Sequence, residues 1–254
     1  MERLIGKRAL ITGATSGVGK QITALLLARG VKVTAVGRRV EQLSQLQKTY
    51  NQLNIIATDL LKPDDFNQLL DWIDHQTGFD YLINCAGFAD YGALIDQSDQ
   101  VIADMIHVNL TQTVILTKHV ISNMSHGSMV VTIGSLSAKV TTPFGAIYAA
   151  SKSGINHVMN ALRLEQQHIH FLNVNTGPVN TTFIQKANKG KPMHHLAEKV
   201  QLDVTQLSEK IIEAMIYKKT ELNLPIWMNG GLKLYGLAPR KLERLLRKYF
   251  MTKK

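Results

Sequence analysis

Short apolar runs rich in β-branched residues alternate along this chain with segments of helical period. Arg8–Thr12 predicts a strand, and Gly17–Arg29 carries an apolar stripe at helical spacing. This alternation is typical of βαβ units on a parallel sheet. Runs such as Met129–Ile133 are apolar at almost every position, which indicates a sheet covered on both faces. The pattern therefore predicts an α/β fold, a doubly wound parallel sheet with helices on both faces.

The same reasoning extends along nearly the whole chain. The further strands that we expect are Val31–Val36, Asn54–Ala57, Tyr81–Asn84, Ser128–Ile133, His170–Asn175 and Leu222–Ile226. The further helices that we expect are Val40–Tyr50, Pro63–His75, a long stretch that ends near Ser125, Ile147–Glu165 and Thr205–Tyr217. They form one Rossmann-like domain over residues 1–230, followed by a basic amphipathic tail helix over residues 231–254. In such a sheet, a ligand binds at the carboxyl ends of the strands.

Composition excludes several other classes of protein. The chain has 254 residues, of which 45% are hydrophobic and 19% charged, and this argues against a disordered or fibrous protein. Its single cysteine, Cys85, excludes an internal disulfide and a cysteine-based zinc site, and we expect no metal. No run approaches the roughly 18–20 apolar residues of a membrane span, and Met1–Gly6 lacks the apolar core of a signal peptide. We therefore expect a cytoplasmic protein.

The formal net charge of +10 belongs mostly to the tail. Residues 233–254 hold eight Lys or Arg and one acid, Glu243, whereas the rest of the chain holds 21 basic and 18 acidic side chains. A basic surface over the whole molecule is thus not indicated. No zinc-finger spacing or aromatic-basic RNA-binding signature is present either, and we expect no nucleic-acid partner.

A glycine-rich turn follows the first expected strand and opens the first helix. It reads Thr12-Gly-Ala-Thr-Ser-Gly-Val-Gly19. Glycines there allow a sharp turn and a close approach to a phosphate, whose charge the positive end of the helix favours. The turn predicts a dinucleotide site made by Gly13, Thr15, Ser16, Gly17, Val18 and Gly19. A tight corner without a ligand is the alternative, because the spacing differs from the G-x-G-x-x-G fingerprint.

The end of the second strand indicates which dinucleotide the site takes. An acid there would bind the ribose 2′-hydroxyl of NAD, but no carboxylate lies between Val31 and Val40. Arg38 and Arg39 occupy that place instead, and a guanidinium pairs well with a 2′-phosphate. We therefore expect NADPH (NADP+), with Arg38 as the main contact. The alternative is that both arginines are merely solvated.

A phenol and an ammonium stand four residues apart at Tyr148 and Lys152, which puts them on one face of the expected helix. A cation beside a phenol should lower its pKa from about 10 and fit it to move a proton near neutral pH. Ser135 follows the fifth expected strand, at the carboxyl end of the sheet, where its hydroxyl could stabilise charge on a carbonyl oxygen. Ser137 is a nearby alternative whose hydroxyl could simply close the loop.

These features occur together with other motifs in a familiar order. The motifs are Asp59-Leu60, Asn84-Cys85-Ala86-Gly87, Asn109 within Val-Asn-Leu, and Thr176-Gly177-Pro178-Val179-Asn180-Thr181. Over about Lys7–Thr182, the chain resembles the short-chain dehydrogenase/reductase family, in its shorter single-domain branch. Two residues depart from the family pattern, Cys85 in place of Asn and Thr176 in place of Pro. Both departures concern the geometry around the cofactor rather than the chemistry.

The resemblance implies an oxidoreductase that transfers hydride between NADPH and a small-molecule carbonyl or secondary alcohol. Tyr148 would donate or accept the proton, Lys152 would hold the ribose hydroxyls, and Ser135 would orient the carbonyl. Asn109 would anchor a water that feeds protons to Lys152. The implied cofactor contacts also include Asp59, Leu60, Asn84, Ala86, Gly87, Pro178, Val179 and Thr181. The resemblance further implies a homodimer or homotetramer. A non-catalytic NADP(H)-binding sensor or scaffold is the alternative.

Two segments outside these motifs carry positive charge. The segment Thr182–Gln201, where the family sets its specificity, is basic and includes His194 and His195; it either attracts an anionic substrate or is a solvated loop. From Pro239 onward, one predicted helical face is apolar and the rest is basic. Its apolar face is formed by Leu242, Leu245, Leu246, Tyr249 and Phe250. Peripheral contact with a membrane through residues 239–250, docking on its own domain and docking on a second subunit all remain open.

Overall fold

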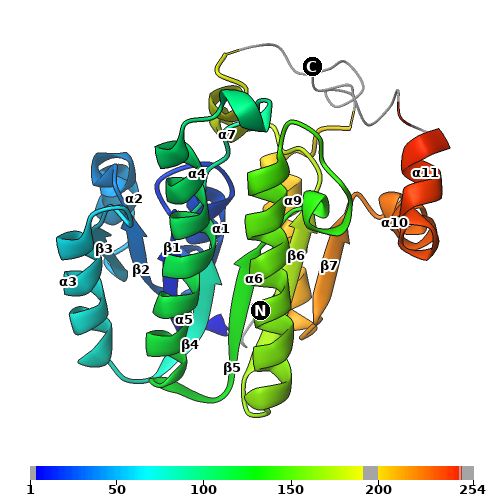
Figure 1. Ribbon diagram of the computed structural model, residues 1–254. Helices are drawn as coiled ribbons and strands as arrows, with labels where there is room; N and C mark the ends of the chain where they lie inside the picture. Colours follow the sequence, from blue (N-terminus) through cyan, green and yellow to red (C-terminus); the bar gives the residue numbers. More distant parts are fainter. Residues whose placement is uncertain (1–3, 191–199, 246, 248–254) are drawn as a thin grey trace.

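A computed structural model describes residues 4–190, 200–245 and 247 of the chain. In this part of the chain, seven parallel strands form one sheet in the order β3-β2-β1-β4-β5-β6-β7 (Figure 1). The strands are β1 (Arg8–Thr12), β2 (Lys32–Gly37), β3 (Leu53–Ala57), β4 (Phe79–Asn84), β5 (Met124–Ile133), β6 (His170–Thr176) and β7 (Glu221–Leu224). The α-helices are α1 (Gly17–Leu27), α2 (Ser44–Thr49), α3 (Pro63–Asp74), α4 (Asp99–Ile106), α5 (Thr113–Ile121), α6 (Ala146–Glu165), α7 (Thr182–Ala187), α9 (Val204–Ile216), α10 (Met228–Leu237) and α11 (Pro239–Leu245).

Helices cover both faces of the sheet, and successive strand residues alternate between the two cores. Ala9 and Ile11 of β1 pack with α1, α2 and α9 on one face, whereas Leu10 packs with α3, α5 and α6 on the other. All of these β1 side chains are at most 1% exposed, as the apolar strand sequence requires. The doubly wound α/β fold expected from the sequence is confirmed.

Local signals in the sequence set several helix ends. Pro63 opens α3, where its missing amide hydrogen costs nothing, and Asp64 and Asp65 follow it in the first turn. The Ser98 hydroxyl accepts a hydrogen bond from the Val101 amide at the start of α4. The Asp203 carboxylate does the same for the Gln206 amide (2.9 Å) at the start of α9.

The structure differs from the expected elements in several places, of which three bear on the course of the chain. The long helix expected to end near Ser125 is divided by a π-helical segment at His107–Gln112. The strand expected at Leu222–Ile226 ends at Leu224, because Pro225 has no amide hydrogen with which to continue the pairing. Helix α10 begins at Met228, so the expected boundary between residues 230 and 231 falls inside a helix.

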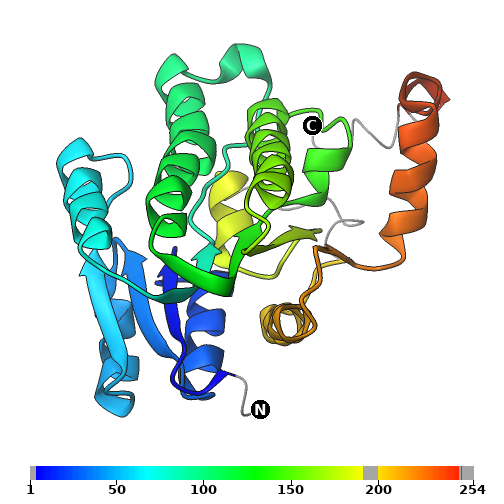
Figure 2. The same ribbon diagram turned by 90° about the horizontal axis from the view of Figure 1, so that it is seen from below.

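The sheet order places a potential site between β1 and β4. The chain builds the sheet outward from β1 to β3 and then returns to the other side of β1 with β4. Loops that leave the carboxyl ends of β1 and β4 therefore diverge, which opens a crevice there. Helices α10 and α11 lie beyond β7, outside the two helical layers (Figures 1 and 2).

Candidate active site

A cavity of about 560 Å³ opens at the carboxyl ends of the strands, in the crevice that the topology predicts. Loops after β1, β2, β3, β4, β5 and β6 all contribute to its wall. Of the twenty residues expected to be catalytic or to bind the cofactor, seventeen line it: Gly13, Thr15, Ser16, Gly17, Val18, Arg38, Arg39, Asp59, Leu60, Ala86, Gly87, Ser135, Tyr148, Lys152, Pro178, Val179 and Thr181. The other three, Gly19, Asn84 and Asn109, lie outside its lining among the described residues.

The glycine-rich turn passes against the end of β4 with no room for side chains. A Cβ on Gly13, whose φ is +66°, would lie 2.8 Å from the backbone nitrogen of Ala86. A Cβ on Gly19 would lie 2.4 Å from the Gly13 carbonyl oxygen, so this glycine supports the turn from behind. The Thr12 hydroxyl oxygen accepts hydrogen bonds from the Cys85 and Ala86 amides, both at 3.2 Å. These contacts fix the turn and expose the amino-terminal end of α1 to the cavity.

Arg38 and Asp59 face each other at the far end of the cavity. The Arg38 Nη1 atom lies 3.8 Å from Asp59 Oδ2, and the arginine side chain is 64% exposed, so this pair contributes little to stability. The other carboxylate oxygen of Asp59 accepts a hydrogen bond from the Leu61 amide at 3.1 Å, which orients the acid. Arg38 is therefore free to approach an anion in the cavity.

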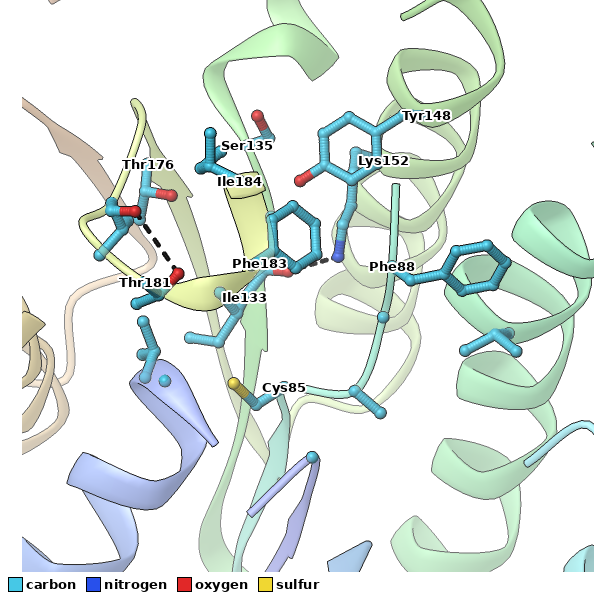
Figure 3. Close-up of a pocket in the computed structure, with 18 of the residues that line it drawn as sticks. Cys85, Phe88, Ile133, Ser135, Tyr148, Lys152, Thr176, Thr181, Phe183 and Ile184 are labelled. Carbon is cyan, nitrogen blue, oxygen red and sulfur yellow. Dashed lines mark hydrogen bonds between the residues drawn. The ribbon is translucent and has the colours of Figure 1, made fainter. Parts of the chain in front are cut away.

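Tyr148 and Lys152 project from successive turns of α6 into the cavity, and Ser135 faces them from the end of β5 (Figure 3). The Tyr148 and Lys152 side chains are each 7% exposed. The Lys152 ammonium donates a hydrogen bond to the Ile133 carbonyl oxygen at 2.9 Å. The Ser137 amide and hydroxyl both donate to the Ser135 Oγ atom, at 3.2 and 2.7 Å, so Ser137 closes this loop.

The expectation that Lys152 lowers the pKa of Tyr148 is wrong for this structure. Burial raises the pKa of Tyr148, and Tyr91 adds to the rise, while the Ser135 hydroxyl opposes it. Burial also lowers the pKa of Lys152 to about 8. Spacing along a helix showed that the two groups are close, but it could not show that both are enclosed. Loss of water on burial is the largest contribution to both shifts.

Two aromatic rings hold the Tyr148 ring in place. Tyr91 meets it edge-on, with ring centroids 5.9 Å apart and the planes at 88°. Phe183 of α7 lies 5.9 Å away on a tilt of 54°. Burial raises the pKa of Tyr91 to about 12. The phenol of Tyr148 is thus enclosed by apolar surface, which favours its neutral form.

Asn109 and Asn84 support the cavity wall from behind. The Asn109 amide accepts from the Phe88 amide at 2.9 Å and donates to the Phe88 carbonyl at 2.8 Å, which clamps the loop after β4. It also donates to the Ser151 hydroxyl at 3.1 Å, so both amide hydrogens are engaged within the protein and the second lone pair of Oδ1 is the one position left for the expected water. Asn84 donates to the Thr117 hydroxyl at 2.9 Å. Both asparagines are at most 3% exposed.

This arrangement has counterparts among known proteins. A family model described as short chain dehydrogenase matches residues 7–192. The chain belongs to the short-chain dehydrogenase family. In sequence, it is 31% identical to dehydrogenase/reductase SDR family member 7B of Xenopus tropicalis over 71% of this chain and 63% of that protein. It is 28% identical to the 3-oxoacyl-[acyl-carrier-protein] reductase FabG of Buchnera aphidicola over 89% of this chain and 97% of that one.

Solved short-chain dehydrogenase structures share the fold. One from Sphingobium yanoikuyae, in complex with NADPH, superposes with a TM-score of 0.79 at 21% identity, over 94% of this chain and 95% of that one. Another from Burkholderia phymatum, in complex with NAD, gives a TM-score of 0.80 at 18% identity, over 94% and 96% of the two chains. At these identities, the likeness establishes the fold of this short-chain dehydrogenase, with both nucleotides represented among its neighbours.

Sequence reasoning missed several residues around the predicted site of this short-chain dehydrogenase. Thr12 was seen only as part of the turn, although its hydroxyl binds two amides of the β4 loop. Phe88, Tyr91 and Phe183 line the cavity, but they come from segments with no motif of their own. A threonine that ends a buried strand beside a glycine turn was the one signal in the sequence that could have been used.

Other predicted features give mixed outcomes. Burial raises the pKa of the Cys85 thiol to about 11, which keeps it protonated at neutral pH. His194 and His195 lie outside the described residues, as do Leu246, Tyr249 and Phe250 of the tail. Among the residues that the structure does describe, no group of three acids, histidines or cysteines could hold a metal ion. No helix in the described part is long and apolar enough to cross a membrane.

Proposed function

We propose that this short-chain dehydrogenase uses NADPH to reduce an apolar ketone or aldehyde, with Tyr148 as the proton donor. The observation that carries the proposal is the enclosure of Tyr148. Burial raises its pKa, which keeps the phenol protonated at neutral pH and ready to give its proton to an alkoxide. A base for alcohol oxidation would need the phenolate, which the same burial disfavours.

The residues around the turn fit a dinucleotide. Side chains at Gly13 and Gly19 would fill the space through which the turn approaches β4, and the start of α1 presents unpaired amides to the cavity. When bound, a nicotinamide nucleotide supplies the hydride that this chain's side chains cannot. Arg38 supports NADPH over NADH, because its exposed guanidinium lies in the cavity wall where a 2′-phosphate would need a partner.

The chain's own groups divide the remaining work. Ser135 donates a hydrogen bond to the substrate carbonyl oxygen and holds it near the Tyr148 hydroxyl. The carbonyl carbon gains hydride, the oxygen takes the Tyr148 proton, and an alcohol results. Lys152, held by the Ile133 carbonyl, has a pKa near 8 and can return a proton toward the phenolate.

The apolar side chains in the cavity wall favour an apolar substrate. Phe88, Tyr91, Val140, Phe183 and Met228 all contribute to it. The basic segment gives less support to an anionic substrate, because neither lysine of its described part lines the cavity. One of them, Lys189, pairs instead with Asp90 at 3.0 Å.

Replacing Tyr148 with phenylalanine tests the proton donor. The change keeps the ring and removes the hydroxyl, so turnover of ketones with NADPH should fall by roughly 10²- to 10⁴-fold. Tyr217→Phe is the matched control, since it removes an exposed phenol hydroxyl away from the cavity and should leave turnover in place. Unchanged turnover in Tyr148→Phe would contradict the scheme. A parent protein that binds NADPH but reduces no carbonyl in a broad panel would instead be a nucleotide-binding sensor.

Arg38→Ala tests the nucleotide. Affinity for NADPH should fall about tenfold, a modest change because the side chain is exposed, while affinity for NADH stays the same. Arg163→Ala removes an exposed arginine elsewhere and serves as the control. Calorimetry with both nucleotides measures the difference. Tighter binding of NADH than of NADPH by the parent would refute the assignment.

A further inference from the structure

Helices α10 and α11 carry an apolar surface that faces away from the protein. Trp227 and Leu234 stand seven residues apart, two helical turns, and are 68% and 58% exposed. Gly230 and Gly231 lie between them and add no side chain that would cover either. Leu237, the next residue of this surface, is 83% exposed. Exposed apolar residues clustered in this way mark a contact with something outside the domain.

The opposite side of the two helices is attached to the domain. The Tyr235 hydroxyl accepts from the Thr141 amide (3.1 Å) and donates to Glu243 (2.6 Å), which also accepts from the Thr141 hydroxyl (2.6 Å) and pairs with Arg240 (3.0 Å). These donors lower the pKa of Glu243 to about 2, so its charge is fixed and engaged. The helices are therefore held with their apolar surface outward.

The same two helices and the residues that follow them carry positive charge. Lys233, Lys241, Arg244 and Arg247 are exposed, and none of them has an acidic partner among the described residues. Glu243 is the only acid of residues 233–254, and it is already paired. The tail thus presents cations beside tryptophan and leucine, without a compensating negative charge.

We propose that α10 and α11, with Trp227, form a docking surface for an anionic lipid bilayer. Tryptophan and leucine enter the headgroup boundary, and each nearby lysine or arginine adds electrostatic attraction to acidic lipids. A second copy fits less well, because a symmetric contact would set two strongly basic tails against each other. In this arrangement, the helices would lie along the bilayer surface with their apolar side chains in the headgroup boundary.

Docking in this way would bring the cavity entrance to the bilayer. Met228, at the start of α10, lines the cavity, and so does Thr141, which anchors the tail. An apolar carbonyl compound dissolved in the lipid would then have a short path to Tyr148. This consequence rests on the proposed function, whereas the docking itself does not.

Fluorescence of Trp227 provides a direct test. Trp72 is the only other tryptophan, and the full-length Trp72→Phe protein leaves Trp227 as the single reporter. The protein is mixed with vesicles of phosphatidylcholine alone or of phosphatidylcholine with phosphatidylserine. We expect a blue shift of the emission and co-sedimentation only with the serine lipid. No shift with either vesicle, or equal binding to both, would overturn the proposal.

Paired variants separate the two contributions. Lys233→Gln/Lys241→Gln/Arg244→Gln removes three charges but keeps the Arg240–Glu243 pair, and binding should weaken on the order of 100-fold. Leu234→Ser/Leu237→Ser should weaken binding on the order of 50-fold. The controls are Lys32→Gln/Lys48→Gln/Lys118→Gln and Ile95→Ser/Leu164→Ser, which change equally exposed residues elsewhere and should bind as the parent does.

Two further readouts make other occupants and a failed reaction distinguishable. Sedimentation equilibrium without lipid reports self-association. The parent could form a dimer that is lost in Leu234→Ser/Leu237→Ser, and bind neither kind of vesicle. That result would assign the surface to a second copy and refute lipid docking. Reduction of a water-soluble ketone without vesicles should be the same in the parent and in both tail variants. Lipid binding by a protein that lacks turnover would support docking and refute only the proposed reaction.

Discussion

Replacing Gly13 with alanine tests the close approach on which the nucleotide-binding turn depends. The new Cβ would lie 2.8 Å from the Ala86 nitrogen and 2.9 Å from the Ala86 Cα and Cys85 carbonyl carbon. All three are backbone atoms at the end of β4, which is paired with β1 and β5 and has little freedom to move. Gly13 also has a φ of +66°, where an L side chain is strained.

Two costs contribute to the expected loss of stability. A left-handed alanine costs about 1–2 kcal/mol, and an extra methyl group in a packed site costs about 1–3 kcal/mol. Gly13→Ala should therefore lower the free energy of unfolding by about 2–5 kcal/mol. Gly6→Ala is the matched control, because Gly6 has a φ of +75° and nothing within 4 Å of an added Cβ. It should lose only the first part, about 1–2 kcal/mol.

Urea unfolding followed by circular dichroism measures both variants against the parent. The difference between them isolates the steric cost, since strain and the entropy of the unfolded chain affect both alike. Calorimetry should also show weaker NADPH binding for Gly13→Ala and parent-like binding for Gly6→Ala. Equal destabilisation of the two variants would refute the close approach. Parent-like stability of Gly13→Ala would refute it too.

Three further predictions concern the same cavity. Thr12→Val leaves two amides of the loop after β4 without their acceptor and should lower the free energy of unfolding by about 1–3 kcal/mol. Thr12→Ser keeps the hydroxyl and should retain most of the parent's stability, which urea unfolding can measure. The rate of ketone reduction should be independent of pH below about 8 and fall above it, because Lys152 then loses its proton. The raised pKa of Tyr148 keeps its phenol protonated over the same range. A rate that increases through pH 8 would contradict this. Gly87→Ala places a Cβ 2.9 Å from Asn109 Oδ1 and 3.4 Å from Lys152 Nζ. Steady-state kinetics should show kcat reduced roughly 100-fold, and NADPH binding should weaken because Gly87 and Lys152 are both expected cofactor contacts.

The fold was predictable because buried strands and helix faces require apolar residues at defined positions in the sequence. A strand covered on both faces must be apolar throughout, and β1 is read directly from Ala9–Thr12. Helices that cover one face of a sheet keep an apolar stripe, as α1 does. The π-helical segment at His107–Gln112 could not be predicted in this way, because one extra residue in a turn barely changes the spacing of apolar residues along a helix.

The site was predictable only where its residues follow a strand or share a helix face. Tyr148 and Lys152 meet because four residues make about one helical turn. Tyr91 and Phe183, which enclose Tyr148, come from loops and a short helix far apart in sequence. Their contact depends on how the layers pack, and no local spacing encodes it. The contacts of Asn109 with Phe88 were not predictable for the same reason, since the two residues lie 21 positions apart.

One physical cause sets the two groups of α6 apart. Burial disfavours charge, so it raises the pKa of Tyr148, an acid that becomes negative, and lowers the pKa of Lys152, a base that becomes positive. At neutral pH, Tyr148 stays a neutral proton donor. Lys152, with a pKa of about 8, is mostly charged but can release its proton. The Ile133 carbonyl keeps that ammonium within the site. Enclosure by Tyr91 and Phe183 stabilises the neutral phenol, which is the form of Tyr148 that the proposed reduction requires.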